Sequence, residues 1–254
     1  MLEVKNVSKD FENRLFSKEK IHAVKGVSFS IEKGKTLGIV GNSGCGKSTL
    51  ARMIAGLLTP TKGDIQLDGI SVVQIKKRLK KSQNIQMIFQ HPESALDPSM
   101  RIRDSLLEPL KIHRIYHRDT KRMEQKLREV MELAHIEEVL LNRYPHQISG
   151  GEAQRVCIGR MLMLNPKVVL LDEPTSMLDV SVQAYIMNLL KELQRKMEFT
   201  YLIISHDLEI LHWICDDILV MNKGEMIEYG KAEEIFINPK HAFTKSLVEA
   251  FTYF

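Results

Sequence analysis

The chain has 254 residues, of which 44% are hydrophobic and 27% charged, and this composition excludes disordered and fibrous proteins. Its 36 Lys and Arg against 32 Asp and Glu leave a net charge of +4, too small to indicate a nucleic-acid-binding protein. Cys45, Cys157 and Cys215 are too scattered for a disulfide framework or a clustered metal site, and they fit a reducing cytosol. No apolar run approaches the roughly 20 residues of a membrane span, and no signal peptide is recognisable. We therefore expect a cytosolic globular chain.

The first stretch, to about residue 89, is predicted to contain strands and one helix. Apolar and polar residues alternate over residues 27–31, as in a half-buried strand. A short apolar strand over Thr36–Val40 leads into a glycine-rich turn, and Ser48–Leu57 has helical spacing. Another short strand is predicted over Ile65–Gly69.

The second stretch, from about His91 to Ile148, is polar and favours helices. Leu127, Val130 and Ala134 repeat with the period of an amphipathic helix, together with Met131. Prolines are expected to break this stretch into pieces at positions 92, 98, 109 and 145.

The third stretch alternates helices and strands again. The predicted elements are a helix from near Gly151, a strand over Val168–Leu171, an amphipathic helix over 182–193, a strand over Tyr201–Ile204, a helix over Asp207–Asp216 and a hairpin turning at 222–224. Such alternation predicts an α/β fold with a mainly parallel sheet covered on both faces.

A phosphate-binding loop is predicted at Gly41–Ser48, which reads Gly-Asn-Ser-Gly-Cys-Gly-Lys-Ser between a strand and a helix. Side chains at the glycine positions would keep a phosphate away from the backbone amides. The helix N-terminus and Lys47 add positive charge, and Ser48 is placed to ligate Mg²⁺. Cys45 is interpreted as a tolerated small residue, with a redox nucleophile as the alternative.

Two carboxylates follow the apolar strand that ends at Leu171. The strand would deliver Asp172 to a metal at its carboxyl end, and Glu173 could polarise a water for attack on a γ-phosphate. The alternative without a catalytic role is a pair of carboxylates at the start of a helix. Together with the phosphate loop, the pair indicates a nucleoside triphosphatase.

A second anion site is predicted where Ser149-Gly150-Gly151 opens a helix, because a hydroxyl and unobstructed amides meet there. A flexible hinge capped by Ser149 is the alternative. The order of the motifs along the chain favours the anion site over the hinge. Gln90 follows an apolar strand before this segment, and Leu178-Asp179 and His206 come after it.

With these motifs, nearly the whole chain resembles the ATP-binding subunits of ABC transporters. The loop at 41–48 matches Walker A, and Val168–Glu173 matches Walker B. Gln90 matches the Q-loop, Ser176–Asp179 the D-loop and His206 the switch histidine. The segment from Ile148 to Glu152 resembles the ABC signature, with Ile for the usual Leu and Glu for the usual Gln. Met177 replaces the usual Ala of the D-loop.

Three segments resemble one branch of this family in particular, the peptide/nickel importers. These are Phe89–Pro98, Ser181–Gln183 after the D-loop, and Asn238–Lys245, where Ala242 replaces the usual Pro. The fold this implies is a P-loop NTPase ABC cassette with a mainly parallel RecA-like core sheet. Residues 1–89 and 149–254 would form the catalytic core with an antiparallel β subdomain, and 90–148 a helical subdomain.

The resemblance implies an ATPase that energises membrane import, with ATP and Mg²⁺ as its cofactors. Glu173 would be the general base, and His206 would hold the γ-phosphate and attacking water. Mg²⁺ would be ligated by Ser48, Gln90 and Asp172. The nucleotide would be bound by Phe11, Gly41, Asn42, Ser43, Gly44, Cys45, Gly46, Lys47, Ser48, Thr49, Gln90, Ser149, Gly150, Gly151 and Asp179. Phe16 is the alternative to Phe11 for stacking on adenine.

The partners implied are a second ABC ATPase (a paralogue or another copy of the chain), two integral-membrane permeases and an extracytoplasmic solute-binding protein. The chain would then lie peripherally at the cytoplasmic face of the membrane. No nucleic acid is expected, and the basic run Lys76–Lys81 is interpreted as a solvated face. His113, His117 and His135 are interpreted as surface residues rather than metal ligands.

The motifs leave two function classes open. A soluble ABC-type ATPase acting on nucleic acid would carry a long insertion or a second cassette, and only a modest helical stretch separates Ser48 from Ser149. The importer is therefore preferred. Without the Cys-rich tail of many peptide importers after His241, nickel or a metal chelate is the predicted cargo, and di- or oligopeptides are the alternative.

Overall fold

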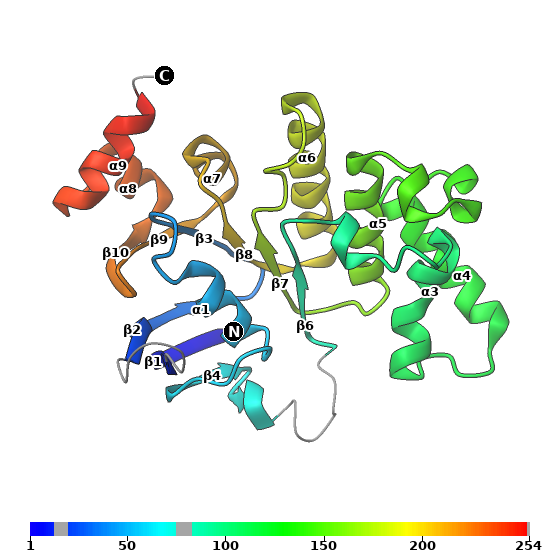
Figure 1. Ribbon diagram of the computed structural model, residues 1–254, viewed down its shortest axis with the longest axis horizontal. Helices are drawn as coiled ribbons and strands as arrows, with labels where there is room; N and C mark the ends of the chain where they lie inside the picture. The colour runs from blue at the N-terminus through cyan, green and yellow to red at the C-terminus, as the bar shows by residue number, and fades with distance from the viewer. Residues whose placement is uncertain (13–19, 75–82, 253–254) are drawn as a thin grey trace. The chain divides into compact units, whose positions relative to one another are not determined.

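The computed structural model describes residues 1–12, 20–74 and 83–252, without the side chains of the last two. The described chain forms two compact units (Figure 1). The first comprises residues 1–82 and 200–254, and the second residues 83–199. The division into 1–89 with 149–254 and into 90–148 stays a prediction.

The first unit contains an antiparallel sheet with strand order β2-β1-β4-β5. Its strands are β1 (Leu2–Glu12), β2 (Lys20–Ile31), β4 (Lys62–Leu67) and β5 (Ile70–Ser71). The alternation over 27–31 places Val27, Phe29 and Ile31 in the core of this unit, as a half-buried strand requires.

The first unit also contains β3 (Thr36–Val40), all five residues of which are buried, together with three further strands. β3 pairs in parallel with β8 (Thr200–Ile204) and β9 (Asp217–Asn222), and β10 (Glu225–Lys231) pairs antiparallel with β9. Continuous apolar runs suit such strands because parallel sheets are covered on both faces. The helices of this unit that lie wholly within the described residues are α1 (Lys47–Ile54), α7 (Leu208–Ile214), α8 (Ala232–Ile237) and α9 (Ala242–Thr252).

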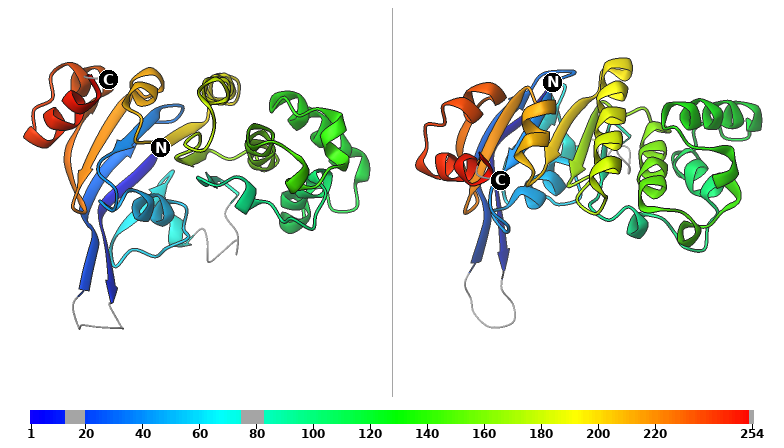
Figure 2. Two further views of the ribbon diagram at one scale, coloured as in Figure 1. Left: turned by 45° about the horizontal axis from the view of Figure 1, so that its top comes forward. Right: turned by 90° about the horizontal axis from the view of Figure 1, so that it is seen from above.

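The second unit contains the parallel pair β6 (Ile85–Ile88) and β7 (Val168–Asp172). Its helices are α3 (Ile102–His113), α4 (Thr120–Leu133), α5 (Gly150–Leu162) and α6 (Val180–Met197), and its short 3₁₀ turns are η1 (Glu93–Ala95), η2 (Glu138–Asn142) and η3 (Pro145–Gln147). Helices α3, α4 and α5 contact one another and group together in every view (Figures 1 and 2).

One sequence expectation about this unit is wrong. Pro109 lies inside α3 and does not end it. An interior proline removes one backbone hydrogen bond and costs about 3 kcal/mol. Burial of Pro109 together with Leu106, Leu107 and Leu110 offsets that cost, because all four side chains belong to the core of the unit.

Candidate functional site

The predicted phosphate loop follows β3, and backbone geometry explains its glycines. Gly41, Gly44 and Gly46 have φ values of 152°, 75° and 106°, a region that L-residues with side chains rarely adopt. A Cβ at Gly41 would lie 2.1 Å from the carbonyl oxygen of Met221, and one at Gly46 would lie 2.3 Å from that of Ala23. The loop therefore packs against two neighbouring backbones at positions where only glycine fits.

Lys47 is folded over this loop. Its Nζ donates to the carbonyl oxygens of Gly41 at 2.6 Å and Asn42 at 3.0 Å. Gly46 stands at the N-cap of α1, and no side chain caps that helix. The ammonium and the first turn of α1 thus supply positive charge and backbone donors at one place, which suits an anionic phosphate.

Cys45 points into the core of the first unit and is 4% exposed. Its carbonyl oxygen accepts a hydrogen bond from Gly224 N at 3.0 Å, which ties the loop to the hairpin between β9 and β10. A thiol buried in this way is not accessible to solvent oxidants. This burial favours the interpretation of Cys45 as a small packing residue.

The second unit brings two predicted site residues into contact. Gln90 follows β6 and Glu173 follows β7, and these strands are parallel neighbours with Ile88 opposite Leu171. Gln90 Nε2 donates to Glu173 Oε2 at 2.8 Å. The carboxyl ends of the two strands therefore place the predicted metal ligand and the predicted general base side by side.

The corner at Glu173 has an unusual backbone and a further polar side chain. Glu173 has a φ of 49°, a left-handed conformation that turns its side chain out of the strand direction of β7. The preceding Asp172 is 9% exposed. Ser176 lies 3.4 Å from Gln90 Nε2, and its Oγ donates to the Glu173 carbonyl oxygen at 3.2 Å. The sequence places Ser176 in the D-loop but gave it no role at the site, although its position three residues after Glu173 suits a turn contact.

Ser149 begins α5 and forms a reciprocal cap with Glu152. Its backbone N and Oγ donate to Glu152 Oε2 at 2.7 and 2.8 Å, and Glu152 N donates to Ser149 Oγ at 3.3 Å. The Ser149 backbone bond lowers the pKa of the Glu152 carboxyl, against desolvation, which raises it. The Glu in place of the usual Gln thus has a structural role at the start of the helix.

The two glycines after Ser149 lie close to the segment before and within α6. A Cβ at Gly151 would lie 2.7 Å from a methyl group of Val182, and one at Gly150 would lie 3.3 Å from a methyl group of Leu178. Asp179 caps α6 by accepting from Val182 N at 3.0 Å and from Ser181 Oγ at 2.6 Å. The Ser181 hydroxyl is the main cause of the lowered pKa of Asp179.

The remaining predicted residues belong to the first unit. His206 follows β8 and is exposed, and the next residue, Asp207, caps α7 through Ile210 N at 3.1 Å. Phe11 lies in β1 with 37% of its surface exposed and the Lys9 ammonium 5.3 Å from its ring centre. Phe16 and the basic run Lys76–Lys81 lie outside the described residues.

The described part of the chain contains no cluster of side chains that could bind a metal ion without a further ligand. Within residues 1–12, 20–74 and 83–252, no three His, Cys, Asp or Glu gather in a way that could hold a metal ion. A magnesium nucleotide needs no such cluster, because protein sites for Mg²⁺ use one or two carboxylates together with water and substrate phosphates. Ligation of Mg²⁺ by Ser48, Asp172 and Gln90 stays a prediction.

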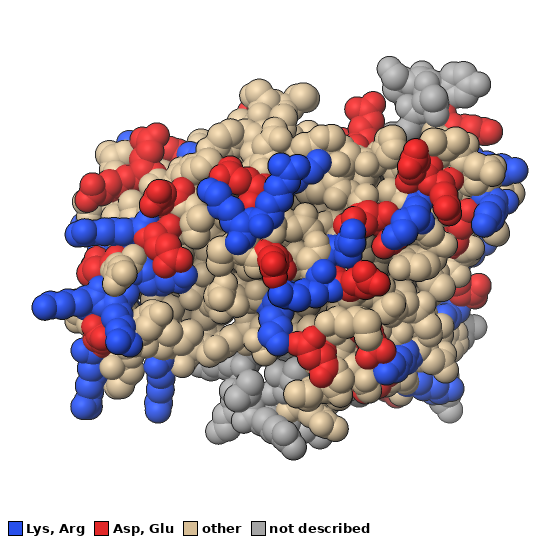
Figure 3. All heavy atoms as spheres, turned by 180° about the vertical axis from the view of Figure 1, so that it is seen from behind, with Lys and Arg blue, Asp and Glu red and all other residues tan. Residues whose placement is uncertain are grey.

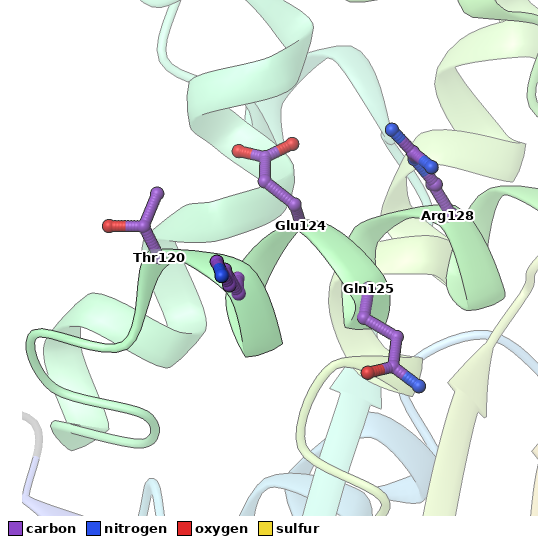
Figure 4. Close-up of a pocket in the computed structure, with 5 residues that line it drawn as sticks. Thr120, Glu124, Gln125 and Arg128 are labelled. Atoms are coloured by element: carbon purple, nitrogen blue, oxygen red, sulfur yellow. The ribbon is translucent and has the colours of Figure 1, made fainter.

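Surface features outside these motifs add little. On the face shown in Figure 3, Lys and Arg lie among Asp and Glu, which gives no support there to the nucleic-acid alternative. A hollow of about 340 Å³ is lined by Thr120, Lys121, Glu124, Gln125 and Arg128, all on α4 (Figure 4). None of these is a predicted site residue. Among the described helices, none has the length and apolar character of a membrane span.

Comparison with known proteins matches the motifs to one family. The model of the family described as ABC transporter matches residues 24–176. The oligopeptide transport ATP-binding protein OppF of Bacillus subtilis is 42% identical over 98% of this chain and 82% of its own length. The di/tripeptide transport ATP-binding protein DppF of Pseudomonas aeruginosa is 42% identical over 91% of the chain and 71% of its own length.

Solved structures of ABC transporter cassettes have the same fold as this chain. A dimeric structure of the bacterial ABC transporter cassette MJ0796 has a TM-score of 0.81 and 30% identity, covering 91% of this chain and 99% of that one. A post-hydrolysis dimer of the same cassette with ADP and phosphate has a TM-score of 0.79. The predicted cassette fold, with parallel strands, an antiparallel sheet and helices, is thereby confirmed. The chain belongs to the ABC transporter family, as an ATP-binding subunit with the fold of the transport ATPases.

Proposed function

We propose that this chain hydrolyses ATP to energise an ABC importer of di- or oligopeptides. The observation that carries the catalytic part is the contact of the Gln90 amide with the Glu173 carboxylate. It joins a predicted metal ligand to a predicted base in a chain that also has the glycine loop and Lys47 geometry of a phosphate site.

The proposed chemistry assigns one task to each residue. The amides of 41–49 and the Lys47 ammonium bind the phosphates, and Ser149 with the amides of Gly150 and Gly151 contacts the γ-phosphate bound by a partner cassette. Ser48, Gln90 and Asp172 hold Mg²⁺, which neutralises charge on the phosphates when it is bound. Glu173 accepts a proton from the attacking water, and His206 orients that water. Phe11 is proposed to stack on adenine, and residues 90–148 to form the helical subdomain.

The cargo proposal follows the alternative reading of the sequence. The relatives at 40–43% identity are named for oligopeptide, dipeptide, di/tripeptide and glutathione transport or import. None of these names supports nickel or a metal chelate, the cargo favoured from the sequence alone. We therefore propose a peptide as the transported molecule, with nickel kept as the contrasting outcome of the test.

The proposed assembly contains this chain, a second ATPase, two integral-membrane permeases and an extracytoplasmic solute-binding protein. In it, this chain lies peripherally at the cytoplasmic face of the membrane. Dimeric cassettes among the similar structures support the pairing of two ATPases. The glutathione import ATP-binding protein GsiA of Pectobacterium atrosepticum is matched over only 37% of its length, so its assembly is a weaker guide than the peptide relatives.

Hydrolysis is tested with the purified chain and Mg²⁺-ATP. We expect Glu173→Gln to lower kcat by about 100-fold or more while ATP still binds, because a general base contributes roughly 10²–10⁴-fold. Glu132→Gln, on the exposed side of α4, is the matched control and should retain activity. Unchanged turnover in Glu173→Gln would refute the assigned base.

Cargo is tested by uptake of a labelled dipeptide, a labelled oligopeptide and labelled nickel in cells that lack the gene. We expect loss of peptide uptake, rescue by the unchanged gene and no rescue by the Glu173→Gln gene, with nickel uptake unaffected. Loss of nickel uptake with peptide uptake retained would overturn the peptide proposal.

A further inference from the structure

Helix α5 holds the segment that follows Gln90 through two of its side chains. Cys157 Sγ donates to the Pro92 carbonyl oxygen at 3.5 Å, and Arg160 Nη1 donates to the Ala95 carbonyl oxygen at 2.5 Å. The two residues are three positions apart and therefore face the same side of the helix. Both ends of the turn η1 are thus fastened to α5, and only His91 separates Gln90 from the first attachment.

Arg160 has a second anchor on another helix. Its Nη2 donates to Glu108 Oε2 of α3 at 2.6 Å, and the two side chains are 23% and 32% exposed. A charge-assisted bond in such a shielded place is stronger than an exposed ion pair. Because the guanidinium is planar and rigid, it holds the Glu108 carboxylate and the Ala95 carbonyl at the same time, which a Lys ammonium on a flexible stem does less well.

The other end of the fastened segment is the amide of Gln90. Its Nε2 is directed to the Glu173 carboxylate, and the opposite arm of the same amide carries Oε1, an acceptor. Mg²⁺ demands near-ideal octahedral geometry. A displacement of the segment from 92 to 95 would therefore move Oε1 away from the position a metal ligand needs.

We propose that Arg160 is a positioning residue that sets Gln90 for Mg²⁺ binding, with Glu108 holding its guanidinium in place. The proposal rests on the proposed function, because it takes Gln90 as a metal ligand. It also gives α5 a second task. The helix that Ser149 caps fixes the metal-ligand segment through Cys157 and Arg160 in its C-terminal half.

The first test measures Mn²⁺ binding to the protein loaded with a non-hydrolysable ATP analogue, by electron paramagnetic resonance. Arg160→Gln is expected to weaken Mn²⁺ binding by about threefold to tenfold, at or below the roughly 10–100-fold cost of losing a direct outer-shell partner, because Arg160 acts through the segment from 92 to 95. Arg103→Gln is the matched control, because it breaks an Arg–Glu pair with Glu124 that joins α3 to α4. The control should stay within about twofold of the unchanged protein.

A double-mutant cycle with Gln90→Ala separates positioning from general destabilisation. If Arg160 acts through Gln90, then Arg160→Gln changes the Mn²⁺ affinity by less than about twofold in the Gln90→Ala background. The same fold-change in both backgrounds would overturn the proposal. If Arg160→Gln does not fold, Arg160→Lys and Glu108→Gln take its place in the same cycle. Each of them keeps one of the two contacts that Arg160 makes with Ala95 and Glu108.

The result is distinguishable from a failure of the proposed function. If Gln90→Ala leaves Mn²⁺ binding unchanged and Glu173→Gln leaves turnover unchanged, the catalytic assignment itself is wrong. If both behave as proposed and the Arg160 effect is the same with and without Gln90, only the positioning role is wrong.

Discussion

The glycines of the phosphate loop are required for two separable reasons, backbone conformation and lack of space. Gly44 and Gly46 both have positive φ, but a Cβ at Gly44 would meet no atom within 4 Å, whereas one at Gly46 would lie 2.3 Å from the Ala23 carbonyl oxygen. Backbone atoms of a neighbouring strand cannot move aside as a flexible side chain can. The two positions therefore form a matched pair for substitution.

We predict that Gly44→Ala lowers the free energy of unfolding by about 1–2 kcal/mol, the cost of a left-handed residue with a side chain. Gly46→Ala should lower it by more, because a steric clash adds to the same strain. Urea unfolding of the two variants measures both costs. Equal losses would show that the Ala23 contact does not constrain the loop.

The Glu152 cap gives a pH-dependent contribution to stability. Its pKa is lowered from 4.5 in the folded chain, mainly by the Ser149 backbone N–H. The stabilisation is therefore present above the ordinary pKa and is lost as the pH falls through the lowered one. We predict that Glu152→Gln, which keeps an acceptor oxygen but no charge, is less stable than the unchanged chain at neutral pH.

This difference should shrink on acidification. The free energy of unfolding is compared for the two proteins by urea titration at about pH 7, 5 and 4, and the gap is expected to narrow only below about pH 5. A gap of constant size over this range would exclude the carboxylate of Glu152 as its source.

At the residue scale, local spacing predicted more than distant pairing could. Gly41–Ser48 is one continuous motif, and the structure gives its three glycines positive φ and gives Gly41 and Gly46 close backbone contacts as well. The strand ends that carry Gln90 and Glu173 are each recognisable in the sequence, but their contact was not predicted, because it depends on β6 and β7 being neighbours. The ion pair of Glu108 with Arg160 could not be predicted from their spacing in the sequence, because the pair depends on how α3 packs against α5.

At the scale of elements, helix α3 shows how much its buried face contributes. Leu106 is completely buried, whereas Ile112 on the same helix is 45% exposed. We predict that Leu106→Ala lowers the free energy of unfolding by about 2–5 kcal/mol, the usual cost of a large-to-small core substitution. Ile112→Ala should change it by no more than about 0.5 kcal/mol. Thermal and urea unfolding of both variants check this, and similar losses would contradict the assigned core face.

Element boundaries were predicted well where a continuous apolar run marked a strand, as for β3, β7 and β8, and where a glycine turn marked the hairpin of β9 with β10. The helix expected over Ser48–Leu57 ends earlier, at Ile54, where Gly56 adopts a positive φ of 69°. Pro109 misled because a local rule for helix ends was applied to a residue whose tertiary burial overrides it. Propensity is a weak guide wherever packing supplies more free energy than the local preference.

For the whole molecule, cargo was the hardest property to predict because the motifs describe only the ATPase chemistry. Glycine loop, carboxylates and switch histidine are the same whether the permease carries a peptide or a metal chelate. The preference for nickel came from a feature outside these motifs, while the peptide alternative is the one that the relatives support. In the proposed assembly the cargo contacts the partner chains, so the cassette motifs do not distinguish one cargo from another.

If two cassettes pair as proposed, each ATP site needs residues from both copies, and this can be tested with two variants. In the proposed dimer, Lys47 of one copy and Ser149 of the other serve the same nucleotide. Lys47→Ala and Ser149→Arg should therefore each abolish hydrolysis in a dimer made of one variant alone, since both of its sites are damaged. A mixed dimer has one site with both lesions and one site with neither.

We predict that mixing equal amounts of the two variants restores ATP hydrolysis, to at most about a quarter of the unchanged protein, because random pairing makes half of the dimers mixed and each has one intact site. Turnover is measured after co-incubation with Mg²⁺-ATP and compared with each variant alone. If the mixture is no more active than the sum of its parts, copies of this chain do not complete each other's sites. A paralogous ATPase would then have to supply the missing Ser-Gly-Gly, and adding that subunit to Ser149→Arg should restore the site that contains this chain's own Lys47.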